Sequence, residues 1–215
     1  MPKNVHEVGL ANPLEKDMAQ QLLSGDNRAN VHPALLALHT VFHVEHNRLC
    51  DEVLQEVGFA TPDEEVFQLA RARNIAQWQA SVYEEYLPAL LGPKLKLKDY
   101  SAYDGDLDVG ISNEFATAAA RFGHSQVNDV QMCVEADFSE CRSGHLLLRD
   151  SYFKPAAFSN SGLTQLLRGM LSQKASLVDT KMVDAMRDQV SNKVSKILCS
   201  NYLSTLKTAS VIVFF

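Results

Sequence analysis

The stretch HPALLALHTVFHVEHNRLCDEVLQEVG, residues 32–58, decides the fold class because it predicts one long helix. Pro33 suits the first turn of a helix, and Gly58 suits its end. Between these two residues, apolar side chains recur at helical spacing. They are Leu35, Leu38, Phe42, Leu49, Val53 and Val57. This spacing places them on one face of the helix, which we expect to be buried.

Residues 61–93 predict a second helix. Thr61 is its expected N-cap, with Pro62 at the first helical position and Glu64 completing a capping box. Pro88 should kink or shorten the last turns, because proline cannot donate the backbone hydrogen bond of a helix interior. The first two helices are therefore expected to follow one another with only a short connection.

A turn-rich segment, residues 93–111, is expected to be a loop, after which Ser112 should cap a short amphipathic helix. This helix is NEFATAAARFGHS, residues 113–125. One of its faces carries Thr117, Arg121 and His124, and the opposite face carries Phe115, Ala118, Ala119 and Phe122. Gly123 either ends the helix or lets another group approach the backbone closely.

Arg121 and His124 lie one turn apart and allow two interpretations. Together they suit a flat anionic ligand, with the imidazole on a metal and the guanidinium on a carboxylate. Alternatively, they are cationic side chains at a helix C-terminus, where the helix dipole favours positive charge. Their spacing alone favours the second interpretation.

Two further segments, residues 163–173 and 176–198, predict helices. Signals for β-strands are poor, except in SVIVFF at residues 210–215, which is apolar and β-prone. We therefore predict a mainly α fold with few or no strands.

The composition argues against several classes of function. The chain has 215 residues and a net charge of −6, whereas a nucleic-acid-binding surface needs clustered basic residues. The amino-terminal residues lack the apolar stretch of a signal peptide. An uninterrupted apolar run of about 20 residues, as a membrane span requires, is also missing. We therefore expect no nucleic-acid partner, no membrane span and no export signal in this sequence.

The four cysteines form no CxxC pair, so a structural zinc site is not expected. Cys133 and Cys141 could close a short loop in an oxidising compartment. Cys50 and Cys199 lie in helical patterns, where a buried free thiol is the usual state.

Three histidines, His39, His43 and His46, share one side of the first helix. Imidazoles in this pattern could bind zinc, iron or copper. However, the first and third lie roughly 10 Å apart along the helix axis, so one straight helix cannot easily surround a metal with all three. The favoured interpretation is that they are structural residues beside the apolar face.

Several motifs, in this order, resemble the animal-type haem peroxidases, the peroxidase–cyclooxygenase superfamily. They are GDNRANVHPALLALHTVFHVEHNRL, EEYLPALLG, NEFATAAARFGH, LLLRDSYF, LLRGM and MVDAMRD. In the family, the segment that LLRGM resembles is a Leu-Leu-Arg-Gly turn. The resemblance runs from about Gly25 to about Arg187 and implies part of the family's helical haem domain.

The resemblance implies a haem b cofactor and a role for three residues. His124 takes the position of the proximal ligand of the haem iron, Arg121 that of a haem-propionate partner, and Arg28 that of the distal arginine. The implied activity is that of an oxidoreductase that reduces hydrogen peroxide and oxidises a halide or an organic donor. The family is usually exported from the cell.

The sequence also departs from the family pattern. The family's distal histidine lies upstream of Gly25 between two calcium-binding aspartates, whereas this chain has only His6 there, so we expect no calcium site. Val31 replaces a glutamate that many members join to haem through an ester. The family segment with an asparagine that bonds the proximal histidine has no match, and Asn201 is not assigned that role.

These features predict three parts: an amino-terminal segment 1–24, the central part of a haem peroxidase domain at 25–190, and a divergent tail 191–215. We expect a peroxidase impaired by truncation. The alternative is a non-catalytic helical protein that binds haem or a partner, with self-association through exposed core surface.

Overall fold

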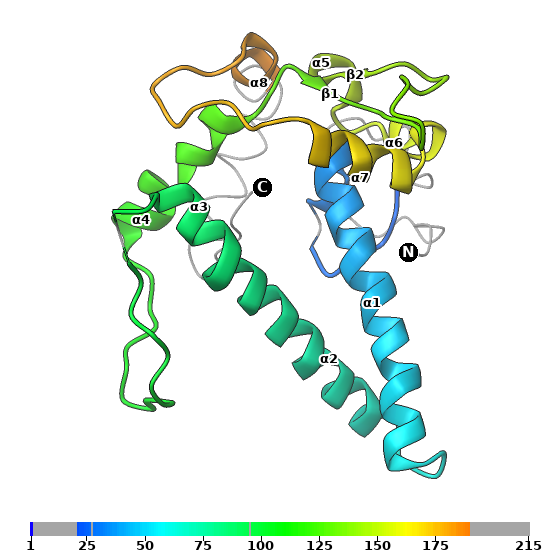
Figure 1. Ribbon diagram of the computed structural model, residues 1–215, viewed down its shortest axis with the longest axis vertical. Helices are drawn as coiled ribbons and strands as arrows, with labels where there is room; N and C mark the ends of the chain where they lie inside the picture. Colours follow the sequence, from blue (N-terminus) through cyan, green and yellow to red (C-terminus); the bar gives the residue numbers. More distant parts are fainter. Residues whose placement is uncertain (2–20, 27, 95, 190–215) are drawn as a thin grey trace. The chain divides into compact units, whose positions relative to one another are not determined.

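The computed structural model describes Met1 and residues 21–26, 28–94 and 96–189 (Figure 1). The chain divides into two compact units, which are described separately. Unit 1 comprises Met1–His39 and Gly110–Phe215, and unit 2 comprises Thr40–Val109. The predicted mainly α fold is confirmed, because helices make up most of the regular structure and the described strands are two residues long each.

Helix α1, Pro33–Val57, confirms the first predicted helix at both ends. Gly58 ends it with a φ of +93°, a conformation that favours glycine, and its N–H donates to the carbonyl of Leu54. The predicted apolar face is buried only in part, since Val57 is 42% exposed. Leu36, which lies outside the predicted stripe, is almost completely buried.

Unit 2 begins with the later turns of α1 and helix α2, Asp63–Ala80. A small core joins them: Leu49 and Val53 from α1 pack with Val66 and Ala70 from α2. The helical apolar spacing of both segments explains this contact, because each helix must bury one stripe of its surface.

The predicted capping box at the start of α2 does not form. The Thr61 hydroxyl donates to the carbonyl of Val57 at 3.2 Å, the end of the preceding helix, and Pro62 occupies the cap position without a side-chain bond. Glu64 accepts a hydrogen bond from Gln68 instead of reaching back to the cap. Thr61 therefore stabilises the end of α1 and not the beginning of α2.

The predicted disturbance at Pro88 takes the form of a π-helical segment, Ser81–Tyr86, followed by helix α3, Leu87–Leu91. The N–H of Leu87 donates to the carbonyl of Val82, five residues earlier. Since Pro88 has no N–H, the regular α-helical bond is missing at this point. The described residues of the following segment, 96–111, contain no helix or strand, as predicted.

Unit 1 contains short elements that gather around the amino-terminal part of α1 (Figure 1). They are β1 Val130–Gln131, β2 Leu146–Leu147, α5 Leu148–Ser151, α6 Pro155–Ser161, α7 Leu163–Ser172 and α8 Asp184–Gln189. The two strands are antiparallel, with Val130 opposite Leu147. Of the predicted helix 176–198, only α8 is described as helical; residues 176–183 are not helical, and residues 190–198 lie outside the described part.

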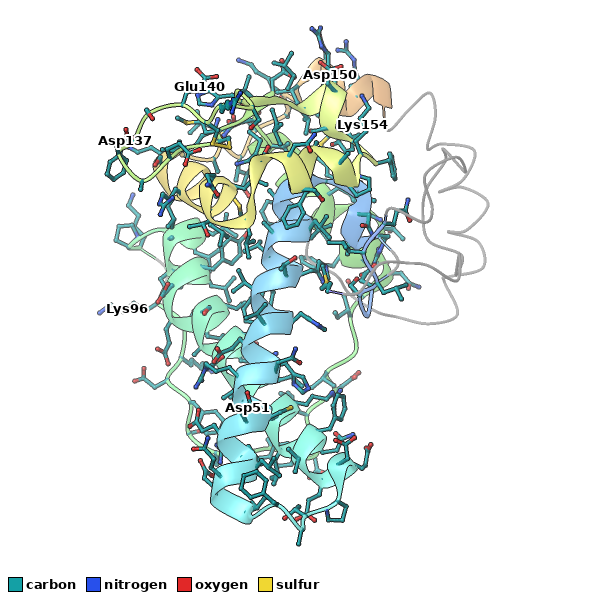
Figure 2. The ribbon with its side chains drawn as sticks, turned by 90° about the vertical axis from the view of Figure 1, so that its right-hand side faces the viewer. Asp51, Lys96, Asp137, Glu140, Asp150 and Lys154 are labelled. Carbon is teal, nitrogen blue, oxygen red and sulfur yellow. A yellow bond between two sulfur atoms is a disulfide. The ribbon has the colours of Figure 1, made fainter. Side chains whose placement is uncertain are left out.

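A disulfide joins Cys133 to Cys141, which confirms that these two cysteines close a short loop. Figure 2 shows the sulfur–sulfur bond close to the labelled Asp137 and Glu140, which lie on this loop. Both cysteines belong to the main core of unit 1, together with Leu36 of α1, Phe158 and Leu166. The disulfide is therefore part of the core and not a surface link.

Gly169 explains how α7 reaches this core. A β-carbon at position 169 would lie 1.8 Å from the carbonyl oxygen of Met132, so the helix backbone contacts the chain just before Cys133 directly. This glycine belongs to the motif LLRGM, which is described in the family as a turn; here it lies inside α7. The glycine is needed for close packing and not for a turn.

Cys50 is a free cysteine on α1, as predicted, and is only partly buried. Three positions considered in the sequence, His6, Cys199 and Asn201, and the segment SVIVFF lie outside the described residues. Among the helices that are described, none combines the length and the apolar character that a membrane crossing requires.

Candidate functional site

The segment that carries Arg121 and His124 is built from two helical pieces and not from the single amphipathic helix that was predicted. Ser112 caps the first piece, α4 Asn113–Thr117, by accepting the N–H of Phe115 at 3.2 Å, as expected. Ala118 then departs from helical geometry, with φ −123° and ψ −65°. A 3-10 helix, Ala119–Gln126, follows.

The 3-10 geometry brings Arg121 and His124 onto one side. A 3-10 helix has three residues per turn, so residues i and i+3 lie directly above one another, whereas in an α-helix they are about 60° apart around the axis. Gly123 lies inside this helix and does not end it. The two side chains therefore share a face more closely than the predicted α-helix would allow.

The environment of His124 keeps its imidazole neutral. Its ring is half-buried, and burial together with the positive charge of Arg121 lowers the pKa of His124 below its ordinary value. At neutral pH the ring is therefore unprotonated, and one of its nitrogens has the lone pair that a metal ligand needs. This is the protonation state in which histidine coordinates iron.

Arg121 is also half-buried and lies within electrostatic range of a second arginine. Burial, and then the positive charge of Arg28, lower the pKa of Arg121 below its ordinary value. Arg28 comes from the short segment before α1, far from Arg121 in the sequence. The structure thus brings Arg28, Arg121 and His124 into one electrostatic neighbourhood within unit 1.

Asp26 holds the Arg28 side chain in place. Its carboxylate accepts bonds from Arg28 Nε at 3.0 Å and Arg28 Nη2 at 2.9 Å, and also from the backbone N–H of Arg28 at 2.7 Å. Burial alone would raise the pKa of Asp26, but the bonds from Arg28 outweigh it and leave the pKa below its usual range. This bidentate pair uses the edge of the guanidinium formed by Nε and Nη2.

The turn that carries this pair is itself anchored by Asn30. The buried Asn30 side chain accepts the N–H of Leu22 at 2.9 Å and donates to the carbonyl of Leu22 at 2.8 Å. Asp26 and Asn30 are residue types that favour turns, but the sequence alone does not show these bonds. The spacing of an aspartate two residues before an arginine was the signal that could have identified the pair.

Two of the three α1 histidines have neighbours within the protein that the structure describes. His39 lies near Asp26 and Arg28, and burial is the main cause that lowers its pKa. His46 contacts the Cys50 sulfur at 3.5 Å and packs edge-on against the ring of Phe67. Within the described ranges, no group of three histidine, cysteine or acidic side chains is placed to hold a metal ion. These contacts agree with the structural interpretation of the cluster.

Comparison with known proteins identifies the family. The sequence profile described as animal haem peroxidase matches residues 2–201. The chain belongs to the animal haem peroxidase family. Peroxinectin A of Dictyostelium discoideum is 35% identical over 188 residues, which are 87% of this chain and 34% of that protein. Thyroid peroxidase of Sus scrofa is 32% identical over 195 residues, which are 88% of this chain and 20% of that protein.

A solved structure shows the same fold. Peroxidase A from Dictyostelium discoideum superposes with a TM-score of 0.78 at 33% sequence identity and covers 86% of this chain. The match covers 35% of that chain, so this sequence spans about a third of the length of these Dictyostelium relatives.

The residues of unit 1 fit the cofactor of this family. In peroxidases a histidine nitrogen holds the haem iron, and a guanidinium can pair with a propionate carboxylate. His124 supplies a neutral imidazole, and Arg121 supplies a half-buried guanidinium one turn away. The donor set is therefore of the kind that haem needs.

Proposed function

We propose that this chain contributes the haem site of a peroxidase that reduces hydrogen peroxide and oxidises a halide or a small organic donor. In this proposal residues 25–190 form the central part of the haem peroxidase domain, flanked by segment 1–24 and tail 191–215. The observation that supports it most directly is the pair Arg121 and His124 on one face of a 3-10 helix, within a sequence that belongs to the family.

In this proposal, His124 binds the haem iron through one ring nitrogen. The depressed pKa favours the neutral ring, so no proton has to be removed before the nitrogen coordinates. Arg121 lies one 3-10 turn earlier and neutralises a propionate carboxylate with a charge-assisted hydrogen bond. Both side chains therefore orient the same cofactor from one short helix.

Arg28 acts on the peroxide. Haem, when bound, supplies an iron centre that exchanges electrons with the substrate. The guanidinium of Arg28 donates hydrogen bonds to the peroxide oxygens and stabilises the negative charge that develops as the oxygen–oxygen bond breaks. Asp26 binds the guanidinium through two hydrogen bonds and fixes its plane, so the guanidinium is oriented before the substrate arrives.

Haem titration followed at the Soret band tests the ligand assignment. We expect the wild-type chain to bind close to one haem, and His124→Ala to lose the specific band. His43→Ala is the matched control, because His43 is also a partly buried histidine of depressed pKa but belongs to unit 2. If His43→Ala abolishes binding and His124→Ala does not, the assignment is wrong.

Peroxide turnover of the haem-loaded chain tests Arg28. Arg28→Ala should lower turnover by roughly 10²- to 10³-fold, the usual cost of losing one donor to developing charge. Arg48→Ala is the control, because Arg48 forms exposed ion pairs on α1 in unit 2. Equal turnover of both variants would contradict the role of Arg28.

A non-catalytic helical protein is the second candidate. Large apolar side chains remain exposed on both units, among them Phe59, Val109, Phe138, Leu171 and Leu177. Such surfaces favour association with another protein or with a second copy. Sedimentation of the purified chain over a range of concentrations, together with the haem titration, distinguishes this candidate from the peroxidase.

A further inference from the structure

The 3-10 helix that carries His124 is unusually long. It spans eight residues, Ala119–Gln126, whereas 3-10 helices longer than three or four residues are uncommon because their hydrogen bonds are poorly aligned. A helix of this kind needs support from outside itself. The contacts around its carboxyl end show where that support comes from.

An extended segment, residues 173–179, runs alongside the chain that follows His124. We call it the strap. The N–H of Ser176 donates to the carbonyl of Gln126 at 3.0 Å and so satisfies the last residue of the 3-10 helix. The Ser176 hydroxyl donates to Asn128 Oδ1 at 2.6 Å, and Asn128 Nδ2 donates to the carbonyl of Lys174 at 2.8 Å.

Ser125, the residue directly after His124, links the strap to the 3-10 helix. Its hydroxyl donates to the carbonyl of Phe122 at 2.8 Å, within the same helix. The same oxygen accepts the N–H of Asp179 at 3.2 Å, from the end of the strap. One hydroxyl therefore joins the turn that contains His124 to a segment 54 residues away in the sequence.

The exposure pattern of the strap agrees with these bonds. Gln173 and Ser176 are its only half-buried residues, and the others are exposed. These are also the two strap residues whose side chains bond the 125–132 segment, since Gln173 Nε2 donates to the carbonyl of Val130 at 2.8 Å. The strap is therefore attached to that segment by polar contacts and has no apolar core of its own.

We propose that the strap is a positioning element for His124: Ser125, Asn128 and Ser176 hold the 3-10 helix so that His124 and Arg121 stay on one face. This inference rests on the proposed function, in which His124 binds the haem iron. Without the strap, the segment is free to relax toward α-helical geometry, which turns Arg121 and His124 about 60° apart around the axis. The imidazole and the guanidinium would then share a face less closely, which weakens their joint hold on one cofactor.

Hydrogen–deuterium exchange of the haem-free chain gives the first test. Asn128→Ala removes both side-chain bonds to the strap, so the amides of residues 119–128 and of Ser176 should exchange about fivefold faster or more. Ser139→Ala is the control, because the hydroxyl of Ser139 bonds only its neighbour Asp137 on the exposed disulfide loop. Unchanged exchange at residues 119–128 in Asn128→Ala overturns the proposal.

The haem complex gives the second test. Ser125→Ala should raise the haem dissociation constant by roughly fivefold to tenfold and shift the iron–histidine stretching band in the resonance Raman spectrum of the ferrous complex. Ser125→Thr keeps the hydroxyl and should restore both values. A merely structural role would lower stability without moving that band.

The outcomes separate this inference from the proposed function. One outcome is that His124→Ala loses haem while Ser125→Ala and Asn128→Ala do not shift the iron–histidine stretching band. In that case the strap proposal is wrong and the ligand assignment stands. If His124→Ala keeps its haem and its spectrum, the ligand assignment itself fails, and with it the positioning role.

Discussion

Unit 2 and unit 1 differ in what holds them together. Unit 2 contains the later turns of α1, which Gly58 ends, and helix α2, and its core is a small set of apolar contacts between them. Unit 1 is made of short elements joined by a disulfide, a glycine contact and hydrogen bonds between distant segments. All three candidate site residues lie in unit 1. The irregular unit, supported by long-range contacts, is thus the one that carries the proposed chemistry.

The largest expected effect tests the close contact of α7 in unit 1. Gly169→Ala places a methyl group 1.8 Å from the Met132 carbonyl oxygen, so α7 or the disulfide loop must move. We expect the free energy of unfolding to fall by about 3 kcal/mol or more, at or above the upper end of the usual cost of overpacking, because the contact involves backbone atoms. Urea unfolding followed by far-ultraviolet circular dichroism measures this change.

Gly105→Ala is the matched control in unit 2, because its β-carbon would meet nothing closer than 3.5 Å. The only tryptophan of the chain, Trp78, lies on α2 and packs edge-on against Phe42, so its fluorescence reports unit 2. If Gly169→Ala shifts the transition seen by Trp78 fluorescence as much as the one seen by circular dichroism, the Gly169 contact supports both units and not unit 1 alone.

His32 should make unit 1 sensitive to acid. Its Nδ1 accepts the N–H of Ala34 at 3.0 Å, its ring packs against Tyr152, and burial lowers the pKa of His32 to about 4. The unfolded chain, with an ordinary histidine pKa near 6.5, then binds more protons between pH 6.5 and 4. Stability is therefore present above pH 6.5 and is lost as the pH falls toward 4, by up to roughly 3 kcal/mol.

Urea unfolding at pH 7, 5.5 and 4 measures this loss, with His32→Asn as the comparison. Asparagine can still accept the N–H of Ala34 but does not titrate, so the variant should lose less stability on acidification. If the free energy of unfolding depends on pH in the same way in both proteins, His32 is not the cause of the acid sensitivity.

The disulfide should contribute somewhat less. Replacing both Cys133 and Cys141 by alanine opens a short loop, and we expect a loss of about 2–3 kcal/mol because the unfolded chain gains conformational freedom. The thermal unfolding midpoint of this double variant should also become insensitive to dithiothreitol. Cys50→Ala, in unit 2, is the control and should keep the dithiothreitol response of the wild type.

The smallest effect is expected at the exposed ion pair of unit 2. Arg73 Nη1 donates to Glu56 Oε1 at 2.9 Å, and this bond is the main cause that keeps the pKa of Glu56 below its usual range. Arg73→Ala should return the pKa of Glu56, followed by NMR titration, toward its ordinary value. The urea midpoint should stay unchanged, because exposed pairs contribute little to stability. A midpoint shift as large as that of Gly169→Ala would contradict the view that unit 2 is held by its apolar contacts.

A sequence-based prediction succeeded where neighbouring residues alone decide the structure, in either unit. Ser112 was correctly predicted as a cap, and the loop before it was correctly placed, since both depend on neighbouring residues. Thr61 was predicted to cap α2 but bonds the end of α1, because two helix ends lie within its reach and local pattern cannot choose between them. Residues 176–183 were predicted to begin a helix but are not helical, because residues 176–179 belong to the strap, whose backbone N–H groups bond the segment after His124.

For the candidate site, the sequence predicted which residues take part but not the contacts that they make. The motifs named Arg28, Arg121 and His124, and their roles stay predictions that the haem titration and the turnover measurement test. The bidentate pair of Asp26 with Arg28 and the strap were not predicted. Each depends on side chains that meet in space, and neither produces a periodic pattern in the sequence.

The sequence by itself determined the family, the long helix α1 and the chemical identity of the proposed site residues, because motif order and helical periodicity are local properties. The tertiary structure decided that residues 119–126 form a 3-10 helix, that Gly169 lies against Met132, and that the strap reaches Ser125. These features arise from hydrogen bonds and close contacts between segments far apart in the chain. Their energies exceed the weak local preferences of the residues involved, so only the folded chain selects them.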